Sequence, residues 1–175
     1  MKYLSLKEFL FAALFTSLTV IGSYLIIPLP ISPVPITLQT FFVLMSGLIG
    51  GKFVGLLSQL IYLLIGFIGI PVFAGGLGGI GILFSPTGGF LIAFPIAAFI
   101  SGISKQTTST NLLILKLISA KFIIYFSGVV FMIIGWDFNI ISALSAGVLP
   151  FIPGDAIKVI LLLIINKRLI NINYL

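Results

Sequence analysis

An aspartate and a lysine stand three residues apart in the last apolar stretch of the chain, Pro150-Phe-Ile-Pro-Gly-Asp155-Ala-Ile-Lys158. Residues at this spacing share one face of a helix. A charged side chain at the centre of a membrane helix costs about 2.5 to 3.5 kcal/mol on insertion scales. Two charged residues in one apolar segment therefore indicate a functional or structural role. One interpretation is a polar ligand pocket, in which the carboxylate accepts N–H groups and the ammonium meets an anion or a carbonyl. The other is a structural ion pair that holds a helix bundle together.

The same segment is predicted to break just before these charges. Pro150 and Pro153-Gly154 interrupt the helical run, and a helix that restarts there presents unpaired N–H groups. With a rise of 1.5 Å per residue, Lys158 lies about 13 Å along the helix from Lys167, which places it near the middle of a membrane. Broken helices at that depth occur where they line a cavity or are packed in protein, so the break favours the pocket.

Two uncharged connectors hold further polar groups. Thr37 and Gln39 follow the proline-rich run Pro28–Pro35 and either offer hydrogen bonds from a stiff loop or cap the next helix; the residues alone favour the cap. The connector after residue 70 is glycine-rich and either brings backbone N–H groups close to a small ligand or makes a tight re-entrant turn. No Gly-Lys-Ser/Thr follows it, which excludes a P-loop. Its candidate ligand-binding residues are Gly75, Gly76, Gly78 and Gly79.

Two more lysines lie in the apolar stretch that precedes this last one. Lys116 is close enough to the polar segment before it for its ammonium to reach the membrane surface. Lys121 is deeper, about 15 Å from Asn111 by helix rise. We expect Lys121 to pair locally or to extend to the surface, and a role in a pocket or pathway is the alternative.

The composition is that of an integral membrane protein. Of 175 residues, 60% are hydrophobic and only 7% are charged, whereas a soluble domain carries about 25% charge. One compact domain over residues 1–175 is expected. The net charge of +6 is dispersed, which excludes a nucleic-acid-binding surface. The chain has no cysteine and no histidine, which excludes disulfides, thiolate and imidazole metal sites, and catalysis by serine–histidine or cysteine–histidine pairs.

The apolar stretches and the charges between them predict the topology. A membrane span needs about 20 apolar residues, and the first stretch is expected to be a retained helix because no small-x-small cleavage site lies near Gly22-Ser23. All lysines and arginines between spans fall at the N-terminus, Lys52, Lys105 and Lys167-Arg168, on one side of the membrane. Positive residues mark the cytoplasmic side, so both termini are predicted there. The result is an all-α bundle of six transmembrane helices, at approximately 9–27, 36–50, 53–70, 90–103, 112–134 and 140–165.

Four motifs, in order along nearly the whole chain, resemble the BioY family. They are Pro33-Val-Pro-Ile-Thr-Leu-Gln-Thr40, Gly69-Ile-Pro-Val-Phe-Ala-Gly-Gly76, Pro86-Thr-Gly-Gly-Phe90, and Leu149-Pro-Phe-Ile-Pro-Gly-Asp155 with Lys158. Members of this family are the biotin-binding S components of energy-coupling-factor (ECF) vitamin transporters. The resemblance implies the six-helix S-component fold, a biotin pocket open to the outside, and a multi-pass protein of the bacterial cell membrane.

The resemblance also implies partners and ligand-contacting residues. The partners would be a transmembrane coupling protein and two cytoplasmic ATPases; ATP would be used by those subunits, and this chain would hold no cofactor. By resemblance Asp155 and Lys158 contact biotin, and Thr37, Gln39 and the loop Gly75–Gly81 lie near it. One departure concerns the first helix, where the superfamily often has an alanine-rich four-step face for docking the coupling protein. Here each possible four-step face has only one alanine among the three positions compared. One face has Ala12, Thr16 and Val20, and the other has Ala13, Ser17 and Ile21.

Three other functions are alternatives to biotin uptake. An S component for another small vitamin shares the Asp155–Lys158 pair, and only the motifs favour biotin. An intramembrane aspartyl enzyme needs two aspartates within the membrane, and Asp137 falls in a connector; residue 152 is also not the glycine of the Gly-x-Gly-Asp pattern. A drug or cation exporter would be expected to carry a buried acid that titrates alone, against which Lys158 argues. The prediction is therefore a binding subunit and not an enzyme.

Overall fold

The computed structural model describes residues 5–103 and 109–171, and these parts are mostly helical. The predicted topology uses the positive charges of Lys2 and Lys105, and both residues lie outside the described residues. The elements before the glycine-rich loop are α1 (Leu6–Tyr24), β1 (Ile26–Ile27), β2 (Ile36–Thr37), α2 (Gln39–Gly50) and α3 (Lys52–Phe67). The elements after it are η1 (Ile80–Phe84), α4 (Gly88–Ser101), α5 (Thr110–Trp136), α6 (Ile140–Gly147), η2 (Leu149–Phe151) and α7 (Ile152–Asn171), where η marks a 3₁₀ helix.

Three of the described segments are long and apolar enough to cross a membrane. They are α1, α5 and the stretch Ile140–Leu169, which contains α6, η2 and most of α7. The helices α2, α3 and α4 are apolar but shorter. The last stretch is not one continuous helix, because the chain turns through the 3₁₀ helix η2 at Pro150 before α7 begins. This interruption falls where Pro150 and Pro153 predicted a break.

A short hairpin replaces the helical ends expected around the proline-rich connector. The predicted helical ranges 9–27 and 36–50 include Ile26–Ile27 and Ile36–Thr37, but these residues pair as antiparallel strands, Ile26 with Thr37 and Ile27 with Ile36. Proline disfavours helical backbone in the residue before it, so Pro28 keeps Ile27 extended, and Pro35 cannot donate an N–H to a helix. The hairpin therefore holds the two ends of the connector together.

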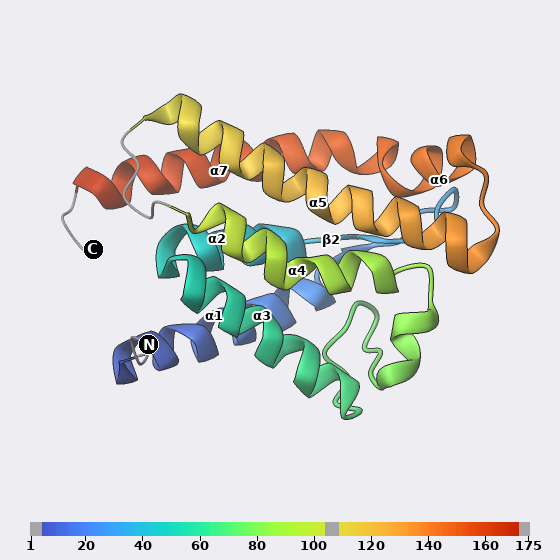
Figure 1. Ribbon diagram of the computed structural model, residues 1–175, viewed down its shortest axis with the longest axis horizontal. Coiled ribbons are helices and arrows are strands. Elements are labelled where there is room, and N and C mark those ends of the chain that lie inside the picture. Colours follow the sequence, from blue (N-terminus) through green and yellow to red (C-terminus); the bar gives the residue numbers. More distant parts are fainter. Residues whose placement is uncertain (1–4, 104–108, 172–175) are drawn as a thin grey trace.

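The helices form a bundle with two outer pairs and a central pair. Figure 1 shows α5 and α7 along one side, α1 and α3 along the other, and α2 and α4 between them, and the packing of α4 on α5, α2 on α7 and α1 on α3 agrees with this view. The start of α1 and the end of α7 lie at the same end of the bundle. The hairpin, the glycine-rich loop and η2 belong to the opposite half, where the chain leaves regular helix.

The central helices approach closely because glycines face one another. A Cβ on Gly47 of α2 would lie 1.9 Å from the carbonyl oxygen of Ala98 in α4, and a Cβ on Gly55 of α3 would lie 2.7 Å from the Cα of Gly47. Small residues let helix backbones meet in a membrane, where lipid is as apolar as the side chains and van der Waals packing supplies much of the association. No larger residue fits these positions without moving a helix.

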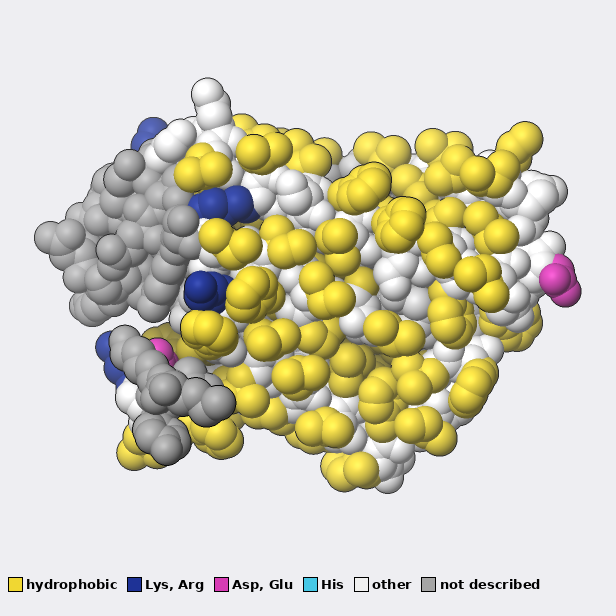
Figure 2. Space-filling view, in the orientation of Figure 1, with side chains coloured by type: hydrophobic (Ala, Val, Ile, Leu, Met, Phe, Trp, Pro, Cys, Tyr) yellow, Lys and Arg dark blue, Asp and Glu magenta, His cyan; other side chains and the backbone are white. Residues whose placement is uncertain are grey.

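The polarity of the molecule is that of a protein surrounded by lipid. Figure 2 shows hydrophobic side chains over the middle of the visible face, with lysine and arginine side chains gathered at one end. The buried set, in contrast, includes polar and charged residues: Thr16, Thr19, Ser23, Gln39, Ser46, Ser58, Gln59, Ser101, Lys116, Lys121, Asp155, Lys158 and Asn166. Polar side chains in such a bundle are expected to meet partners inside it. Three of these residues, Gln39, Asp155 and Lys158, line one cavity.

Candidate ligand-binding site

A cavity of about 410 Å³ lies between the proline-rich connector, the glycine-rich loop and the helices α4, α5 and α7. This volume is within the range of about 300 to 1,000 Å³ that small-molecule sites occupy. Much of the wall is apolar and aromatic and includes Phe73, Phe90 and Phe94. The polar part of the wall is formed by Thr37, Gln39, Thr40, Tyr125, Asp155 and Lys158, together with Ser32, Ser85 and Thr87.

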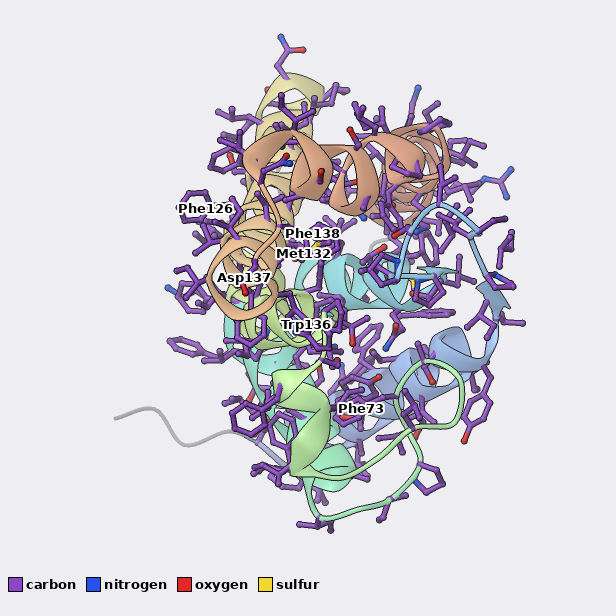
Figure 3. All side chains as sticks on the ribbon, turned by 90° about the vertical axis from the view of Figure 1, so that its right-hand side faces the viewer. Phe73, Phe126, Met132, Trp136, Asp137 and Phe138 are labelled. Carbon is purple, nitrogen blue, oxygen red and sulfur yellow. The ribbon has the colours of Figure 1, made fainter. Side chains whose placement is uncertain are left out.

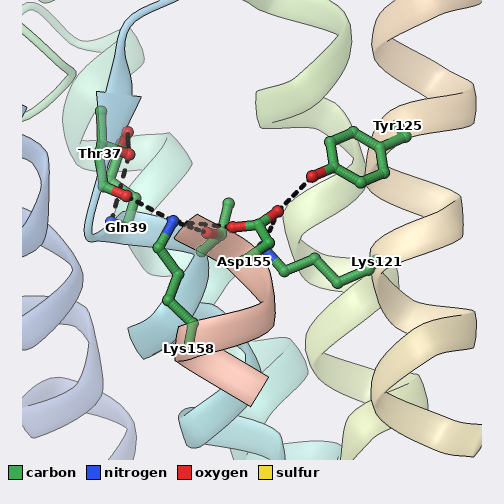
Figure 4. Close-up of polar contacts among 7 residues, drawn as sticks. Thr37, Gln39, Lys121, Tyr125, Asp155 and Lys158 are labelled. Carbon is green, nitrogen blue, oxygen red and sulfur yellow. Dashed lines mark hydrogen bonds and ion pairs between the residues drawn. The ribbon is translucent and has the colours of Figure 1, made fainter. Parts of the chain in front are cut away.

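The Asp155 carboxylate is the centre of the polar wall. It lies in the first turn of α7, where a negative charge also suits the helix dipole. Its Oδ1 accepts from Lys158 Nζ at 2.9 Å, and its Oδ2 forms an ion pair with Lys121 Nζ at 2.7 Å. The Tyr125 hydroxyl donates to the same Oδ2, as Figure 4 shows. One buried carboxylate thus links α7 to two residues of α5.

Lys158 connects α7 to the start of α2. Besides Asp155, its Nζ donates to the carbonyl oxygen of Thr37 at 2.8 Å and to the hydroxyl of Thr40 at 3.0 Å. An ammonium group has three N–H donors, so these three bonds use all of them. The sequence prediction that Asp155 and Lys158 share a helix face is confirmed, and the pair also lines the cavity.

Thr37 and Gln39 line the cavity, and only Thr37 acts as a cap. The Thr37 hydroxyl accepts from the backbone N–H of Gln39, the first residue of α2, at 3.3 Å, while the formal N-cap position, Leu38, gives no side-chain bond. The expectation that Gln39 caps the helix is wrong. Its amide points into the bundle instead, where its Oε1 accepts from the Thr37 hydroxyl and its Nε2 donates to the Tyr62 hydroxyl.

The glycine-rich loop makes a tight turn beside the cavity. Positive φ angles at Gly75, Gly76 and Gly79 (76°, 72° and 93°) favour glycine, and a Cβ on Gly78 would lie 2.6 Å from the carbonyl oxygen of Ile70. Gly75 belongs to the cavity wall; Gly76, Gly78 and Gly79 lie in the same turn but outside that wall. The tight turn is thus observed, and contact between these glycines and a ligand stays a prediction.

Lys121 is buried and forms an ion pair inside the bundle, so it does not extend to the membrane surface, and its partner lies on another helix and not nearby along the chain. Its partner is Asp155, and this brings Lys121 to the back of the site although it is not part of the cavity wall. Tyr125 was missed in the sequence analysis. A signal for it exists, because Tyr125 stands four residues after Lys121 and therefore on the same face of α5.

The chemistry available here is recognition of a polar group. With ordinary charges, two lysines and one aspartate give the cluster a net positive charge, and hydroxyl and amide groups surround it. Within the described residues, no group of three histidine, cysteine, aspartate or glutamate side chains could hold a metal ion.

Asp137 is the left-handed residue that ends α5, beside Trp136 and Phe138 at the end of the molecule seen in Figure 3.

Comparison with known proteins gives a consistent family. The model of the BioY family matches residues 1–173. A protein of Pyrococcus horikoshii named probable biotin transporter BioY is 44% identical over 93% of this chain and 96% of its own length. The biotin transporter BioY of Thermotoga maritima is 38% identical over 94% of this chain and 96% of its own length.

A solved structure agrees with the fold described above. It is the S-component for biotin from an ECF-type ABC transporter, and it matches with a TM-score of 0.84 and 33% sequence identity over 93% of this chain and 90% of that chain. The fold and the cavity therefore define a membrane protein with the fold of an ECF S-component. The chain belongs to the BioY family.

Replacing the shared carboxylate should destabilise the protein more than replacing one of its partners. Asp155→Leu leaves two buried ammonium groups without their counter-charge, which is expected to lower the free energy of unfolding by about 3 to 5 kcal/mol. Lys121→Met should have a smaller effect because Asp155 keeps Lys158. Thermal unfolding in detergent measures both. An Asp155→Leu variant as stable as the parent would contradict the central place of this carboxylate.

Proposed function

We propose that this chain is the biotin-binding, substrate-capture subunit of an ECF-type uptake transporter. The observation that carries the proposal is the pairing of Asp155 with Lys158 on the wall of a cavity of ligand size. The family supports biotin as the ligand, because relatives over nearly the full chain are named biotin transporters. In this role the chain binds and carries a molecule without changing it, so it is not an enzyme.

In this proposal, biotin places its polar groups at Asp155 and Lys158. The carboxylate of Asp155 suits the ureido N–H groups. A carboxylate accepts about four hydrogen bonds and three of these positions are in use, so one N–H fits directly and a second would take the place of a present donor. Lys158 suits either the ureido oxygen or the ligand carboxylate, each of which would take the place of one of its present acceptors. The aromatic part of the wall, Phe73, Phe90 and Phe94, suits the apolar ring system and chain.

Four glycines and two polar residues complete the proposed site. Thr37 and Gln39 extend the polar wall next to Lys158 and have groups that a ligand could engage. Gly75 brings the loop backbone to the cavity, Gly76 and Gly79 supply positive φ angles, and Gly78 allows the close approach to Ile70. Closing of the proline-rich and glycine-rich connectors over biotin would complete its burial.

The proposed location is the bacterial cell membrane, as a single six-span domain over residues 1–175 with both termini in the cytoplasm. Figure 2 shows lysine and arginine side chains gathered at one end of the bundle. Lys7 near the start of α1, Lys52 at the start of α3 and Lys167 near the end of α7 support this orientation, because positive residues are retained on the cytoplasmic side. The cavity connectors then face outward, where a nutrient is captured. Short helices such as α2 and α4 would span with the help of their connectors.

Energy would come from other subunits, a transmembrane coupling protein and two cytoplasmic ATPases. The solved structure similar to this chain is a component of an ECF-type ABC transporter, which supports such an assembly. On α1, Ala12 and Thr16 are buried, and the Thr16 hydroxyl donates to the carbonyl oxygen of Ser58 in α3. Ala13, Ser17 and Ile21 are exposed. The second of the two four-step faces is therefore the one proposed to dock the coupling protein.

The alternatives have less support from the site. An aspartyl enzyme needs a second aspartate beside Asp155, and Asp137 ends α5 in a connector. An exporter with an acid that titrates alone does not fit a carboxylate held by two lysines. Another vitamin remains the strongest alternative ligand, because the Asp155–Lys158 pair would serve other polar ring systems too.

Biotin binding should depend on both residues of the pair. Asp155→Asn and Lys158→Ala each remove a charge-assisted bond to the ligand, and the expected loss of affinity is about 10- to 100-fold. Lys167→Ala on the same helix is the control, because Lys167 is exposed far from the cavity. The measurement is a titration of biotin into the detergent-purified protein. No binding by the folded parent would refute biotin, and unchanged affinity in both variants would make the pair structural.

The proposed orientation can be measured with single cysteines, because the chain has none of its own. Ile31→Cys is exposed in the proline-rich connector, and Lys167→Cys is exposed near the end of α7. In intact cells, a membrane-impermeant thiol reagent should label Ile31→Cys at once and Lys167→Cys only after permeabilisation. The reverse pattern would show that the termini lie outside.

Docking of the coupling protein should depend on the exposed face of α1. Ala13→Leu with Ser17→Leu adds bulk to that face, so co-purification with the co-expressed coupling protein and ATPases should fall at least severalfold while biotin affinity is unchanged, because close helix approach needs small residues. Ser145→Leu, at an exposed small residue of α6, is the control. Undiminished co-purification of the double variant would place the interface elsewhere.

A further inference from the structure

A chain of hydrogen bonds leads from the polar end of the cavity to the glycine-rich loop. Lys158 donates to the carbonyl oxygen of Thr37, and the Thr37 hydroxyl donates to Gln39 Oε1 at 3.0 Å. Gln39 Nε2 donates to the Tyr62 hydroxyl, which donates to the carbonyl oxygen of Val72 at 3.0 Å. From Thr37 onward every bond runs in the same direction, an arrangement in which neighbouring bonds reinforce one another.

Tyr62 is the last side chain of this path and the anchor of the loop. It is fully buried on α3 and is not part of the cavity wall. Besides holding the Val72 carbonyl, its ring packs edge to face on Phe73, with centroids 5.5 Å apart. Phe73 in turn fills the space over Gly66, where a Cβ would lie 2.0 Å from the Phe73 ring. Beyond Phe73 the loop forms cavity wall through Ala74, Gly75 and Leu77.

We infer that Tyr62 is a positioning residue that joins the polar end of the cavity to the loop of residues 71–79, so that contacts made at Lys158 and Gln39 set the position of that loop. Thr37 belongs to β2, Gln39 to α2 and Val72 to the loop. Tyr62 bonds to Gln39 and to Val72, so it joins α2 to the loop. The part of this inference that concerns biotin rests on the proposed function. The part that concerns the loop does not.

A second tyrosine provides a matched control. The Tyr24 hydroxyl donates to the carbonyl oxygen of Pro71, the residue next to Val72, so each tyrosine holds one carbonyl of the same loop. Tyr24 is 53% exposed, and within the described part of the chain its hydroxyl bonds only to the loop. Tyr62→Phe and Tyr24→Phe therefore remove equivalent bonds to the loop, but only Tyr62→Phe also cuts the connection to Gln39.

The test measures loop position with one cysteine in the full chain. Leu77→Cys provides the reporter, because Leu77 lies in the loop, is about half exposed and lines the cavity, and the native chain has no cysteine. The rate of its labelling by a thiol reagent is measured in detergent, with and without saturating biotin. In the reporter parent, biotin should slow labelling severalfold.

The two tyrosine variants should then differ in their response to biotin. Both should raise the labelling rate without ligand by about three- to tenfold, the effect of one lost hydrogen bond. Biotin should still protect the cysteine in Tyr24→Phe, but should protect it at least threefold less in Tyr62→Phe at equal occupancy. Equal protection in the two variants would overturn the inference.

A double-mutant cycle of Lys158 and Tyr62, measured without ligand, tests this inference independently of which ligand the protein binds. Lys158→Met should raise the labelling rate of Leu77→Cys when Tyr62 is present and leave it unchanged in Tyr62→Phe, because the path is already cut; contacting groups are expected to be non-additive in this way. Equal effects of Lys158→Met in both backgrounds would contradict a role for Tyr62 in joining the two ends. A parent that does not bind biotin would refute the proposed function, while this cycle would still decide the role of Tyr62.

Discussion

The structure depends on the burial of one carboxylate between two ammonium groups. A charge inside a membrane bundle is stable only with a counter-charge and hydrogen bonds, because no bulk water solvates it there. Asp155 meets this requirement through Lys121, Lys158 and Tyr125. The first and last of these belong to α5, and Lys158 continues to Thr37 and Thr40 at the start of α2. Because Thr37 belongs to β2 and Thr40 to α2, the ion cluster connects α5, α7, β2 and α2 around the polar end of the cavity.

The remainder of the bundle is stabilised by close packing and by side-chain bonds to backbone carbonyls. Gly47 and Gly55 let α2, α3 and α4 meet, and the Ser101 hydroxyl donates from α4 to the Leu44 carbonyl of α2 at 3.0 Å. At the cavity this regular packing ends, and the connectors are held by the β1–β2 hairpin and by side-chain bonds, such as that from the Ser32 hydroxyl to the Ala146 carbonyl at 2.7 Å. The molecule thus combines a closely packed half with a half in which individual hydrogen bonds from side chains help to hold the connectors.

The sequence was sufficient where the relevant neighbours are close along the chain. Asp155 and Lys158 are three residues apart, so helix periodicity alone predicted that they share a helix face, and proline content predicted the break before them. The hairpin around Pro28–Pro35 was missed because two extended residues at the end of an apolar run look like more helix. The pairing of Lys121 with Asp155 joins residues 34 positions apart (155 − 121), and nothing in their local sequence fixes which faces of α5 and α7 meet.

The same limit explains the outcome at Gln39. Locally it is a polar residue at a helix start, for which a capping role is the ordinary expectation. Its amide turns inward only because Tyr62 of α3 offers a hydroxyl there, a contact between residues 23 positions apart (62 − 39). The motifs of the BioY family compensated for this limit in part, since they identified Thr37 and Gln39 as near the pocket without explaining how they reach it.

A ligand that enters this cavity meets polar groups that already satisfy one another, and this has a consequence for selectivity. Asp155 has room for a further N–H, whereas Lys158 can accept a new partner only by giving up Thr37, Thr40 or Asp155. A molecule with the right apolar shape but no acceptor gains burial and leaves the network intact. A molecule with a misplaced acceptor displaces a bond and leaves a buried group unpaired. Such unpaired groups reject the wrong ligand more strongly than missing apolar contacts do, so the saturated network favours ligands that replace each bond they break.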